Sequence, residues 1–455
     1  MKQLVDLIDS NKDRYVKELM MLCEKPSVSA QNFGIEECAE TLVEMMSSVG
    51  IETHLKHIEG ANPLIIGQVK PRGAKHTIGF YNHYDVQPAD PLEQWVSPPF
   101  KPEIRNGKIY SRGVSDNKGN IVARLKAVEA VLKVMGEVPI GLRFLIEGEE
   151  EIGSINLPQY VEENRDILRA EGYFWEGDGV DEEDRPVVTL GSKGILTAEL
   201  TAVGPCQDVH SAWAPLLPNP AWRLVWALTS IKSVDEKIKI SGWYDDIEKP
   251  SDVEMELLRA MPFNEESEKR RFGIKEYLNG VSGVESRKKL YYGTTCNICG
   301  FDSGYKGPGM KTVLPSIARV KIDFRLVEKQ NPDKLYDMLL KHIESHGFCD
   351  VKVRKVGGYE AAKTSPNDPF ARFAVRKLEE VYGTRPIVAP TTAGTSPIYL
   401  IKNRMGIPVV SCGGVGYPDS NIHSPNENIR IKDFINSIKF YAQFIASYAD
   451  DWNDM

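Results

Sequence analysis

A histidine and an aspartate two residues apart, His83 and Asp85, follow an apolar run at residues 77–81. The run is typical of a buried strand, so both side chains emerge on one side where that strand ends. Ligands bind at this edge of an open α/β sheet. A neutral imidazole binds transition metals, and a carboxylate can fix its orientation. Alone, the pair fits a surface turn closed by Pro88 better, because short motifs match by chance.

Other acidic or imidazole side chains occur in comparable positions along the chain. Asp116 lies between glycines and a helix start, the acidic segment 147–151 and Asp178 each follow an apolar run, and His423 precedes the last helix. Taken singly, Asp116 fits a helix cap and Asp178 an Asp-Gly turn. The adjacent carboxylates of the acidic segment repel one another unless a cation or solvent relieves them. Together these residues form an inventory for two metal ions.

A charge count supports that inventory. Two divalent zinc ions would be neutralised by three ligating carboxylates and one bridging hydroxide, with both imidazoles neutral. One glutamate would remain free to act as a base. Such a site lowers the pKa of bound water towards 7 and stabilises a developing tetrahedral centre.

Length and composition narrow the class of protein. The chain has 455 residues, which favours two or three domains, and 42% hydrophobic with 26% charged residues is globular composition. A net charge of −8 gives no basic field for nucleic acid or an anionic membrane. The seven cysteines are sparse and odd in number, which favours a reducing cytoplasm. The amino terminus resembles an amphipathic helix rather than a signal peptide, and the sequence predicts no membrane span.

Alternating strands and helices predict an α/β fold with a largely parallel, helix-covered sheet. In the middle of the chain, helices opened by Asn219-Pro220 and Asn331-Pro332 are flanked by strand-like runs. That order predicts an inserted α+β domain of the split βαβ, ferredoxin-like kind. We therefore expect a catalytic domain from residues 1–192 and 362–455, and an inserted domain from residues 193–361.

Five ordered motifs give the chain a family resemblance. They are His83-x-Asp85-Val86-x-Pro88, Gly113-x-x-x-Asp116-Asn117-Lys118-Gly119, Glu147-Gly148-x-Glu150-Glu151-x-Gly153-Ser154, Asp208-x-His210-Ser211 and His423-x-Pro425-Asn426-Glu427. The chain resembles the di-zinc metallopeptidases that include carnosinase-like dipeptidases, glutamate carboxypeptidases, aminoacylases and succinyl-diaminopimelate desuccinylases. The match spans nearly the whole chain.

The resemblance implies a role for each motif residue. Asp116 would bridge the two ions, and Glu150 would be the general base, with Asp85 orienting a histidine ligand. Asp178 is the expected ligand after its strand, although some relatives use a glutamate, and Glu176 is two residues away. The Asp116-Asn117 peptide is expected to be cis. The implied metal ligands are His83, Asp116, Glu151, Asp178 and His423.

The resemblance also implies roles for the inserted domain as lid and dimerisation domain. His210 would reach into the partner subunit's active site of a homodimer and polarise the scissile carbonyl. Arg325, with Gly394 and Thr395, would bind the substrate carboxylate. The loop at residues 391–397 lacks the Arg-Glu of animal cytosolic dipeptidases, so their specificity is not transferred. Trp213 and Trp222 are expected to pack within the lid.

The expected activity is that of a cytoplasmic, metal-dependent exopeptidase. It would hydrolyse dipeptides or small peptides with a free C-terminal carboxylate, using a water that bridges the metal ions and the base Glu150. Zinc is the expected metal, with manganese or cobalt as alternatives. An N-acyl amino acid deacylase with the same machinery is the alternative, followed by a non-catalytic binding protein. A phosphohydrolase is disfavoured because no phosphate-binding cradle accompanies the cluster.

Overall fold

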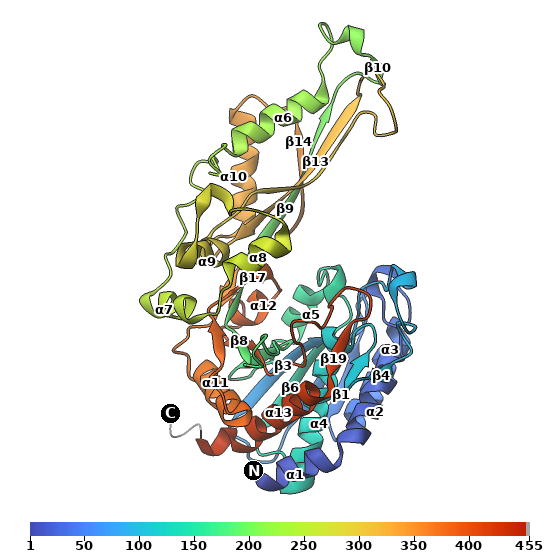
Figure 1. Cartoon of the computed structure of the whole chain (residues 1–455), viewed down its shortest axis with the longest axis vertical. Coiled ribbons are helices and arrows are strands. Elements are labelled where there is room, and N and C mark those ends of the chain that lie inside the picture. The colour runs from blue at the N-terminus through green and yellow to red at the C-terminus, as the bar shows by residue number, and fades with distance from the viewer. Residues whose placement is uncertain (452–455) are drawn as a thin grey trace. The chain divides into compact units, whose positions relative to one another are not determined.

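The computed structural model describes residues 1–451, which form two compact units (Figure 1). The first comprises Met1–Gly191, Thr364–Pro390 and the described residues from Leu400 onward, and the second comprises Ser192–Lys363 and Thr391–Tyr399. This division differs from the predicted boundaries by one or two residues at each end of the inserted domain, and by one longer segment. The segment Thr391–Tyr399 joins the second unit because its strand β17 (Thr392–Thr395) pairs in parallel with β9 (Gly191–Val203).

An eight-stranded sheet forms the centre of the first unit, in the order β1-β2-β6-β3-β7-β18-β8-β16. The four strands β6, β3, β7 and β18 are parallel, while β1 and β2 pair antiparallel at one side. The α/β prediction is confirmed, with antiparallel strands at the flanks. In sheet order the strands are Glu52–Lys56, Leu64–Val69, Gly141–Glu147, Thr77–His83, Tyr173–Trp175, Val409–Cys412, Val187–Thr189 and Ile387–Ala389.

Helices cover this sheet, and two of them, α4 (Gly119–Met135) and α13 (Ile431–Asp451), pack against each other. α4 is buried from Gly119 to Val131, so nearly every face meets other parts of the protein. Asp116, which taken singly fits a helix cap, does not cap α4, because a separate helical turn (Val114–Lys118) with non-helical dihedrals at Asp116 precedes the helix. The other helices are α1 (Lys2–Ser10), α2 (Lys12–Cys23), α3 (Ile35–Ser48), α5 (Leu157–Glu163), α11 (Pro369–Tyr382) and α12 (Tyr399–Lys402).

A small three-stranded sheet, in the order β19-β5-β4, also belongs to the first unit. Its strands are Asn428–Arg430, Lys108–Tyr110 and Glu103–Arg105. Because β19 comes from near the C-terminal helix and the other two precede the Asp116 turn, this sheet connects two distant parts of the chain.

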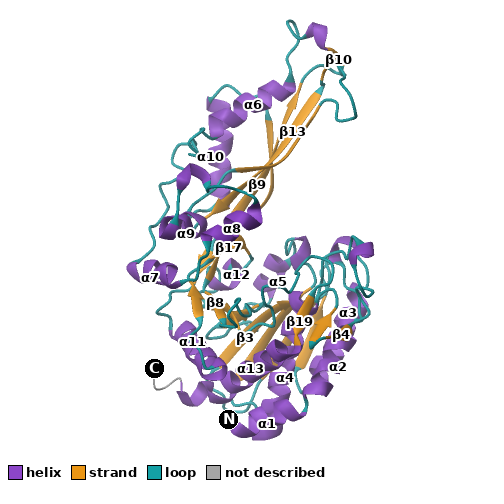
Figure 2. Ribbon diagram, viewed as in Figure 1, coloured by secondary structure: helices purple, strands orange, loops and turns teal. Residues whose placement is uncertain are grey.

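The second unit is built on the antiparallel strands β11 (Asn297–Ser303), β13 (Ile317–Leu326), β9 and β14 (Lys352–Tyr359). Figure 2 shows α6 (Pro220–Ile231) and α10 (Pro332–Ser345) on the same side of these strands. As predicted, Asn219 and Asn331 cap these helices. The remaining elements are α7 (Asp252–Ala260), α8 (Glu265–Phe272), α9 (Gly283–Tyr292), β10 (Val209–His210), β12 (Val313–Leu314) and β15 (Ala362–Lys363).

Each unit has its own apolar core. Alternate residues of β13 are buried, as expected for a sheet with one covered face. Among the described residues, no helix has the length and apolar character needed to span a membrane.

A candidate metal centre in the first unit

Strand β3 ends at His83, the first residue that the sequence predicts to carry chemistry. His83 and Asp85 are fully buried, and His83 Nδ1 lies 3.1 Å from the backbone oxygen and 3.5 Å from Oδ1 of Asp85. These contacts orient the imidazole and leave Nε2 facing the opposite way. The Asp85 carboxylate also accepts the backbone N–H groups of Glu150 (3.2 Å) and Glu151 (3.0 Å). Asp85 therefore connects the histidine to the turn that carries both glutamates.

Asp116 lies between two histidines that are distant in the sequence. Its Oδ1 is 2.9 Å from Nε2 of His83, and its Oδ2 is 3.0 Å from Nε2 of His423. The backbone N–H of Asp116 donates to Glu427, and the Asp116–Asn117 peptide is cis, as the resemblance implies. The two oxygens of one carboxylate thus contact two imidazoles, which is the geometry expected of a ligand shared by two ions.

Glu151 joins the same group. Its Oε2 lies 3.2 Å from His423 Nε2 and accepts a hydrogen bond from Gln87 Nε2 at 2.9 Å. Its Oε1 is buried and has no hydrogen-bond partner among the described residues. One potential ligand atom each from His83, Asp116 and Glu151 lie within 4.8 Å of one another. A buried carboxylate oxygen without a partner is costly, and a cation would relieve that cost.

The structure surrounds the predicted ligand Asp178 with hydroxyl groups. Burial raises the pKa of Asp178, and hydrogen bonds with the side chains of Thr189 and Ser411 oppose that shift. Glu176 has a different environment: burial, followed by the charge of Glu150, raises its pKa well above the usual range. In the described part of the chain, Oε1 of Glu176 and Oδ2 of Asp178 are both buried without a hydrogen-bond partner, so this feature does not separate the two carboxyl groups.

The charges of His83 and Asp116 act on the carboxyl group of Glu176. For Asp178, burial and the two hydroxyl partners account for the shift within the described residues. β7 ends at Trp175, so Glu176 is the first residue beyond that strand and adopts a positive φ of 44°. Within the described residues, the charge of His83 therefore acts on Glu176, whereas no charge of His83 contributes to the pKa shift of Asp178.

Glu150 has the acid–base properties expected of a proton carrier. Burial raises its pKa to about 7; the carboxylates of Asp116 and Glu151 contribute to the increase, and His83 opposes it. A carboxyl group that titrates near neutrality can both accept and return a proton. Glu149, in contrast, accepts N–H groups from two asparagines in neighbouring loops. The geometry thus distinguishes the two adjacent glutamates.

The donor set fits two divalent cations. Burial lowers the pKa of His83, but contacts with Asp116 and Asp85 outweigh this and raise it well above the usual range. The hydrogen bond with Asp116 raises the pKa of His423 to about 10. Carboxylates thus favour the protonated form of both imidazoles. In a site that holds metal, the cations would supply this positive charge instead. Imidazole nitrogen and carboxylate oxygen are ligands of zinc, and of manganese and cobalt as well.

The predicted residue His210 belongs to the second unit, where it ends β10. Its side chain is exposed, and Nδ1 accepts the backbone N–H of Ala212 at 3.1 Å. In the neutral imidazole this leaves the proton on Nε2, which can donate to a carbonyl oxygen. Asp208, from the same motif, accepts hydrogen bonds from the backbone and hydroxyl of Ser316 at 2.8 Å and so fixes the β10 segment.

Arg325 and Thr395 meet within the second unit. Arg325 Nη1 donates to Thr395 Oγ1 at 2.6 Å, and Gly394 is the exposed residue beside this threonine. Thr395 is paired with Lys193 in the β17–β9 ladder. Burial and the charge of Arg325 lower the pKa of Lys193 to about 8. Lys193, to which the sequence assigns no role, therefore adds a second cation near Arg325.

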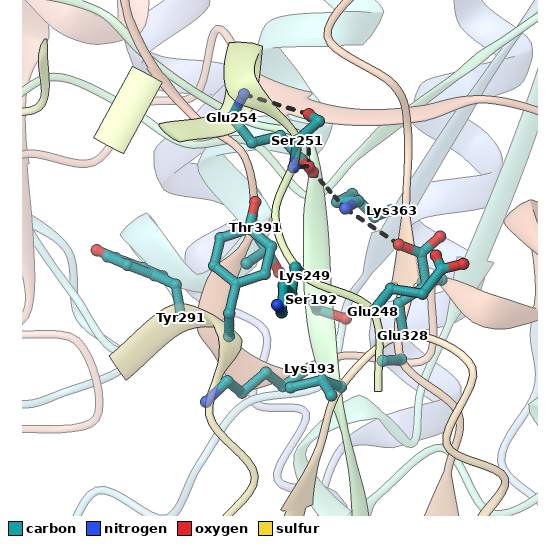
Figure 3. A pocket seen from close by; sticks show the side chains of 14 residues that line it. Ser192, Lys193, Glu248, Lys249, Ser251, Glu254, Tyr291, Glu328, Lys363 and Thr391 are labelled. Atoms are coloured by element: carbon teal, nitrogen blue, oxygen red, sulfur yellow. Dashed lines mark hydrogen bonds and ion pairs between the residues drawn. The ribbon is translucent and has the colours of Figure 1, made fainter. Parts of the chain in front are cut away.

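Lys193 also lines a cavity of about 170 Å³ in the second unit (Figure 3). Its Nζ donates to the backbone oxygen of Gly293 at 2.6 Å. Elsewhere on the wall, Lys363 forms ion pairs with Glu254 and Glu328, which Figure 3 shows as dashed lines. Because the lysine contacts both glutamates, this wall is a structural ion-pair network.

The comparison with known families agrees with this geometry. The model of peptidase family M20/M25/M40 matches residues 79–447, so the chain belongs to that family. The metal-dependent exopeptidase class and the enzyme role predicted from the five motifs are confirmed at this level.

Particular relatives cover almost the same length. The chain is 27% identical over 490 residues to the Cys-Gly metallodipeptidase DUG1 of Candida albicans, covering 98% of this chain and 97% of the relative. It is 27% identical to the human Beta-Ala-His dipeptidase over 85% of this chain and 78% of the relative. A solved M20 metallo-carboxypeptidase, Sso-CP2 from Sulfolobus solfataricus, superposes with a TM-score of 0.90 at 38% identity, covering 95% of this chain and 99% of that one.

Proposed function

We propose that this chain removes residues from dipeptides or small peptides that carry a free C-terminal carboxylate, using two metal ions that share Asp116. The observation that carries the proposal is the position of the Asp116 carboxylate, with one oxygen at His83 and the other at His423. A structural ion pair would need only one of these imidazoles. A carboxylate placed between two nitrogen donors, with further unpartnered carboxylate oxygens nearby, suits two ions.

The proposed ligands divide into two sets around Asp116. His83 and Glu176 would hold one ion, and Glu151 and His423 the other. Glu176 replaces Asp178 in this proposal because its carboxyl group interacts with His83 and Asp116. Zinc is the first candidate, and manganese or cobalt would accept the same donors. Bound ions would lower the pKa of an attacking water and polarise the scissile carbonyl.

The protein groups then have separate tasks. Glu150 would take the proton from the attacking water and return it to the leaving amine, for which a pKa of about 7 is suited. Asp85 would keep His83 in one orientation and hold the backbone of Glu150 at the same time. His210 would donate its Nε2 proton to the carbonyl oxygen as negative charge develops there.

Substrate recognition would rest on the second unit. Arg325, supported by the positive charge of Lys193, would bind the C-terminal carboxylate together with Thr395 and Gly394. Arginine suits this task because its planar fork matches a carboxylate. Two relatives act, by their names, on Cys-Gly and β-Ala-His, both of which are dipeptides with a free carboxylate. This supports a small peptide as the substrate.

We also propose a homodimer in which His210 acts on the partner subunit's substrate.

The prediction that Trp222 packs inside the lid is wrong, because Trp222 on α6 is 57% exposed. Trp226, on the same helix, is 53% exposed and stacks on Trp222 with ring centroids 6.0 Å apart. Trp213 is likewise more than half exposed. Such an aromatic surface is typical of an interface, and we assign it to a second copy of the chain.

A cytoplasmic location is part of the same proposal. All seven cysteines are free thiols, four of them buried. Free thiols persist in a reducing compartment, whereas secreted proteins usually oxidise them to disulfides.

A hydrolysis screen tests the proposed substrate class. The metal-free protein would be reloaded with zinc or manganese and offered dipeptides, the same dipeptides amidated at the C terminus, and N-acetyl or N-succinyl amino acids. We expect cleavage of the free dipeptides and loss of cleavage on amidation. Activity that survives amidation would contradict the role of Arg325. Preference for the acylated amino acids would instead identify the protein as a deacylase, which uses the same centre.

A further inference from the structure

Arg124, in the middle of α4, is fully buried and lies within ion-pair distance of no carboxylate in the described residues. A buried arginine is usually paired with a carboxylate, because removing an uncompensated charge from water is costly. Arg112 follows that rule, since its Nη1 lies 2.8 Å from Glu427 Oε2. Arg124 does not follow that rule, so contacts other than an ion pair must stabilise its charge.

Arg124 forms hydrogen bonds with two strand ends of the proposed metal centre. Its Nη1 donates to the backbone oxygen of Tyr81 at 2.6 Å and to Asn82 Oδ1 at 2.5 Å. Its Nη2 donates to the backbone oxygen of Glu176 at 2.6 Å. Tyr81 and Asn82 directly precede His83, and Glu176 is itself a proposed ligand. One guanidinium group therefore fixes the relative positions of the two segments that would hold the same ion.

A second connection runs from Arg124 to the shared carboxylate. Asn82, which is fully buried, accepts from Arg124 through Oδ1 and donates through Nδ2 to Oδ1 of Asn117. Asn117 follows Asp116 directly in the chain. Arg124 is thus linked through Asn82 and Asn117 to the backbone that positions Asp116, in addition to its place on the helix that begins three residues after Asp116.

The surroundings of Arg124 restrict it to this arrangement. Nη2 also donates to the hydroxyl of Tyr441 at 3.0 Å, and the guanidinium carbon lies 5.1 Å from the ring centroids of both Phe80 and Tyr441. The aromatic faces stabilise the cation where no carboxylate does. A lysine could keep the charge but not the planar fork that reaches the acceptors on both strands. The guanidinium group therefore acts through its planar shape, which lets it reach the acceptors on both strands, and not through its charge alone.

We propose that Arg124 is a positioning residue that holds the His83 and Glu176 segments at the spacing needed by one of the two ions. The inference rests on the proposed two-metal function. Partners that orient metal ligands typically change metal affinity by about 10- to 100-fold when they are lost. Among the described residues, Arg124 makes no hydrogen bond with Glu151 or His423, so the second ion should be much less affected.

Direct metal titration tests the inference without relying on turnover. Metal-free wild type and Arg124→Lys would be titrated with Co²⁺ by calorimetry and visible absorption. We expect two binding events in the wild type and one of them weakened about 10- to 100-fold in Arg124→Lys. In His423→Ala, which removes a ligand of the other ion, the surviving event should be the one that Arg124→Lys weakens. Asn82→Ala should weaken the same event more than the other, because Asn82 directly precedes His83, and it serves if the arginine variant does not fold.

Lys126→Met is the matched control. Lys126 is a buried cation two residues further along α4, but it pairs with Glu18 and Glu129. Its replacement should lower stability and leave both Co²⁺ affinities within about threefold, because its partners lie outside the metal centre. Unchanged affinities in both Arg124→Lys and Asn82→Ala, or equal weakening of both events, would overturn the inference. Failure of the wild type to bind two Co²⁺ ions would instead contradict the proposed function.

Discussion

At the scale of single residues, the site separates side chains that look alike in the sequence. Glu149 and Glu150 are neighbours, yet Glu149 accepts hydrogen bonds from neighbouring loops, whereas burial and nearby carboxylates raise the pKa of Glu150 to about 7. Glu176 and Asp178 are separated by one glycine, yet they have different partners. The motif register predicted the first distinction. The distinction between Glu176 and Asp178 depends on the conformation of the turn after β7, and the spacing of residues does not determine that conformation.

Replacing Glu150 with glutamine should abolish the proton transfer and preserve the shape. We expect the turnover number of Glu150→Gln to fall by roughly 10²- to 10⁴-fold, with bound metal unchanged. Steady-state kinetics and elemental analysis of the same sample would measure both. Glu149→Gln is the matched control, because Glu149 only accepts hydrogen bonds from neighbouring loops. Equal losses in the two variants would remove Glu150 from the role of base.

The choice between Glu176 and Asp178 can be tested through metal content. Glu176→Gln removes a charged ligand from the ion that it would share with His83, so the bound metal should fall from two equivalents towards one after dialysis. Asp178→Asn should retain both equivalents, because its partners are the hydroxyl groups of Thr189 and Ser411. Inductively coupled plasma mass spectrometry gives the count. The reverse pattern would restore Asp178 as the ligand.

At the scale of elements, the parallel strands β6, β3 and β7 end at the same edge of the sheet and bring the acidic segments to His83. These strand ends could be predicted from apolar runs followed by polar residues. The start of α4 could not, because a separate turn carries Asp116 in a non-helical conformation. Nor could the role of Arg124, since one arginine within a helical pattern gives no sign of what it contacts.

The ion pair between Lys363 and Glu254 in the second unit should make the stability of the protein depend on pH. Burial raises the pKa of Glu254, but hydrogen bonds with Lys363 and with Ser251, the residue that caps α7, outweigh this and lower the pKa below its ordinary value of 4.5. A depressed carboxyl pKa contributes stability that is present above the ordinary value and lost as pH falls through the folded-state pKa. Glu254→Gln, which can keep the helix cap, should lower the free energy of unfolding by about 1–2 kcal/mol at pH 7.

The difference between wild type and Glu254→Gln should shrink below about pH 4.5, as measured by urea unfolding across pH. The exposed pair of Lys288 with Glu285 provides the control, and Glu285→Gln should change the free energy of unfolding by less than about 1 kcal/mol. A Glu254→Gln effect that grows on acidification would contradict the assigned sign.

At the scale of the whole molecule, the sequence predicted a catalytic sheet domain with an inserted α+β domain, and the structure has two compact units. The sequence predicts that residues 391–399 belong to the catalytic domain, whereas the structure groups them with the second unit, because the pairing of β17 with β9 joins residues about 200 positions apart. Local patterns do not encode such long-range pairing. For the same reason, the exposure of Trp222 could not be foreseen, since exposed and buried faces of an apolar helix look alike in sequence.

Complementation tests whether His210 acts across a homodimer. Subunits with His210→Ala and subunits with Glu150→Gln would be coexpressed and compared with each variant alone. If the histidine serves the partner's substrate, a mixed dimer contains one complete site, and the mixture should recover about a quarter of wild-type activity. No recovery from verified mixed dimers would show that His210 acts within its own chain. A monomer by sedimentation would contradict the dimer itself.

The proposed function requires that the Asp116 carboxylate joins two cations. Anomalous diffraction from zinc-loaded crystals, recorded on both sides of the zinc edge, tests it most directly. We expect two peaks about 3.5–4 Å apart on either side of Asp116, one beside His83 and Glu176 and the other beside Glu151 and His423. A single peak, or two peaks that do not share the carboxylate of Asp116, would contradict it.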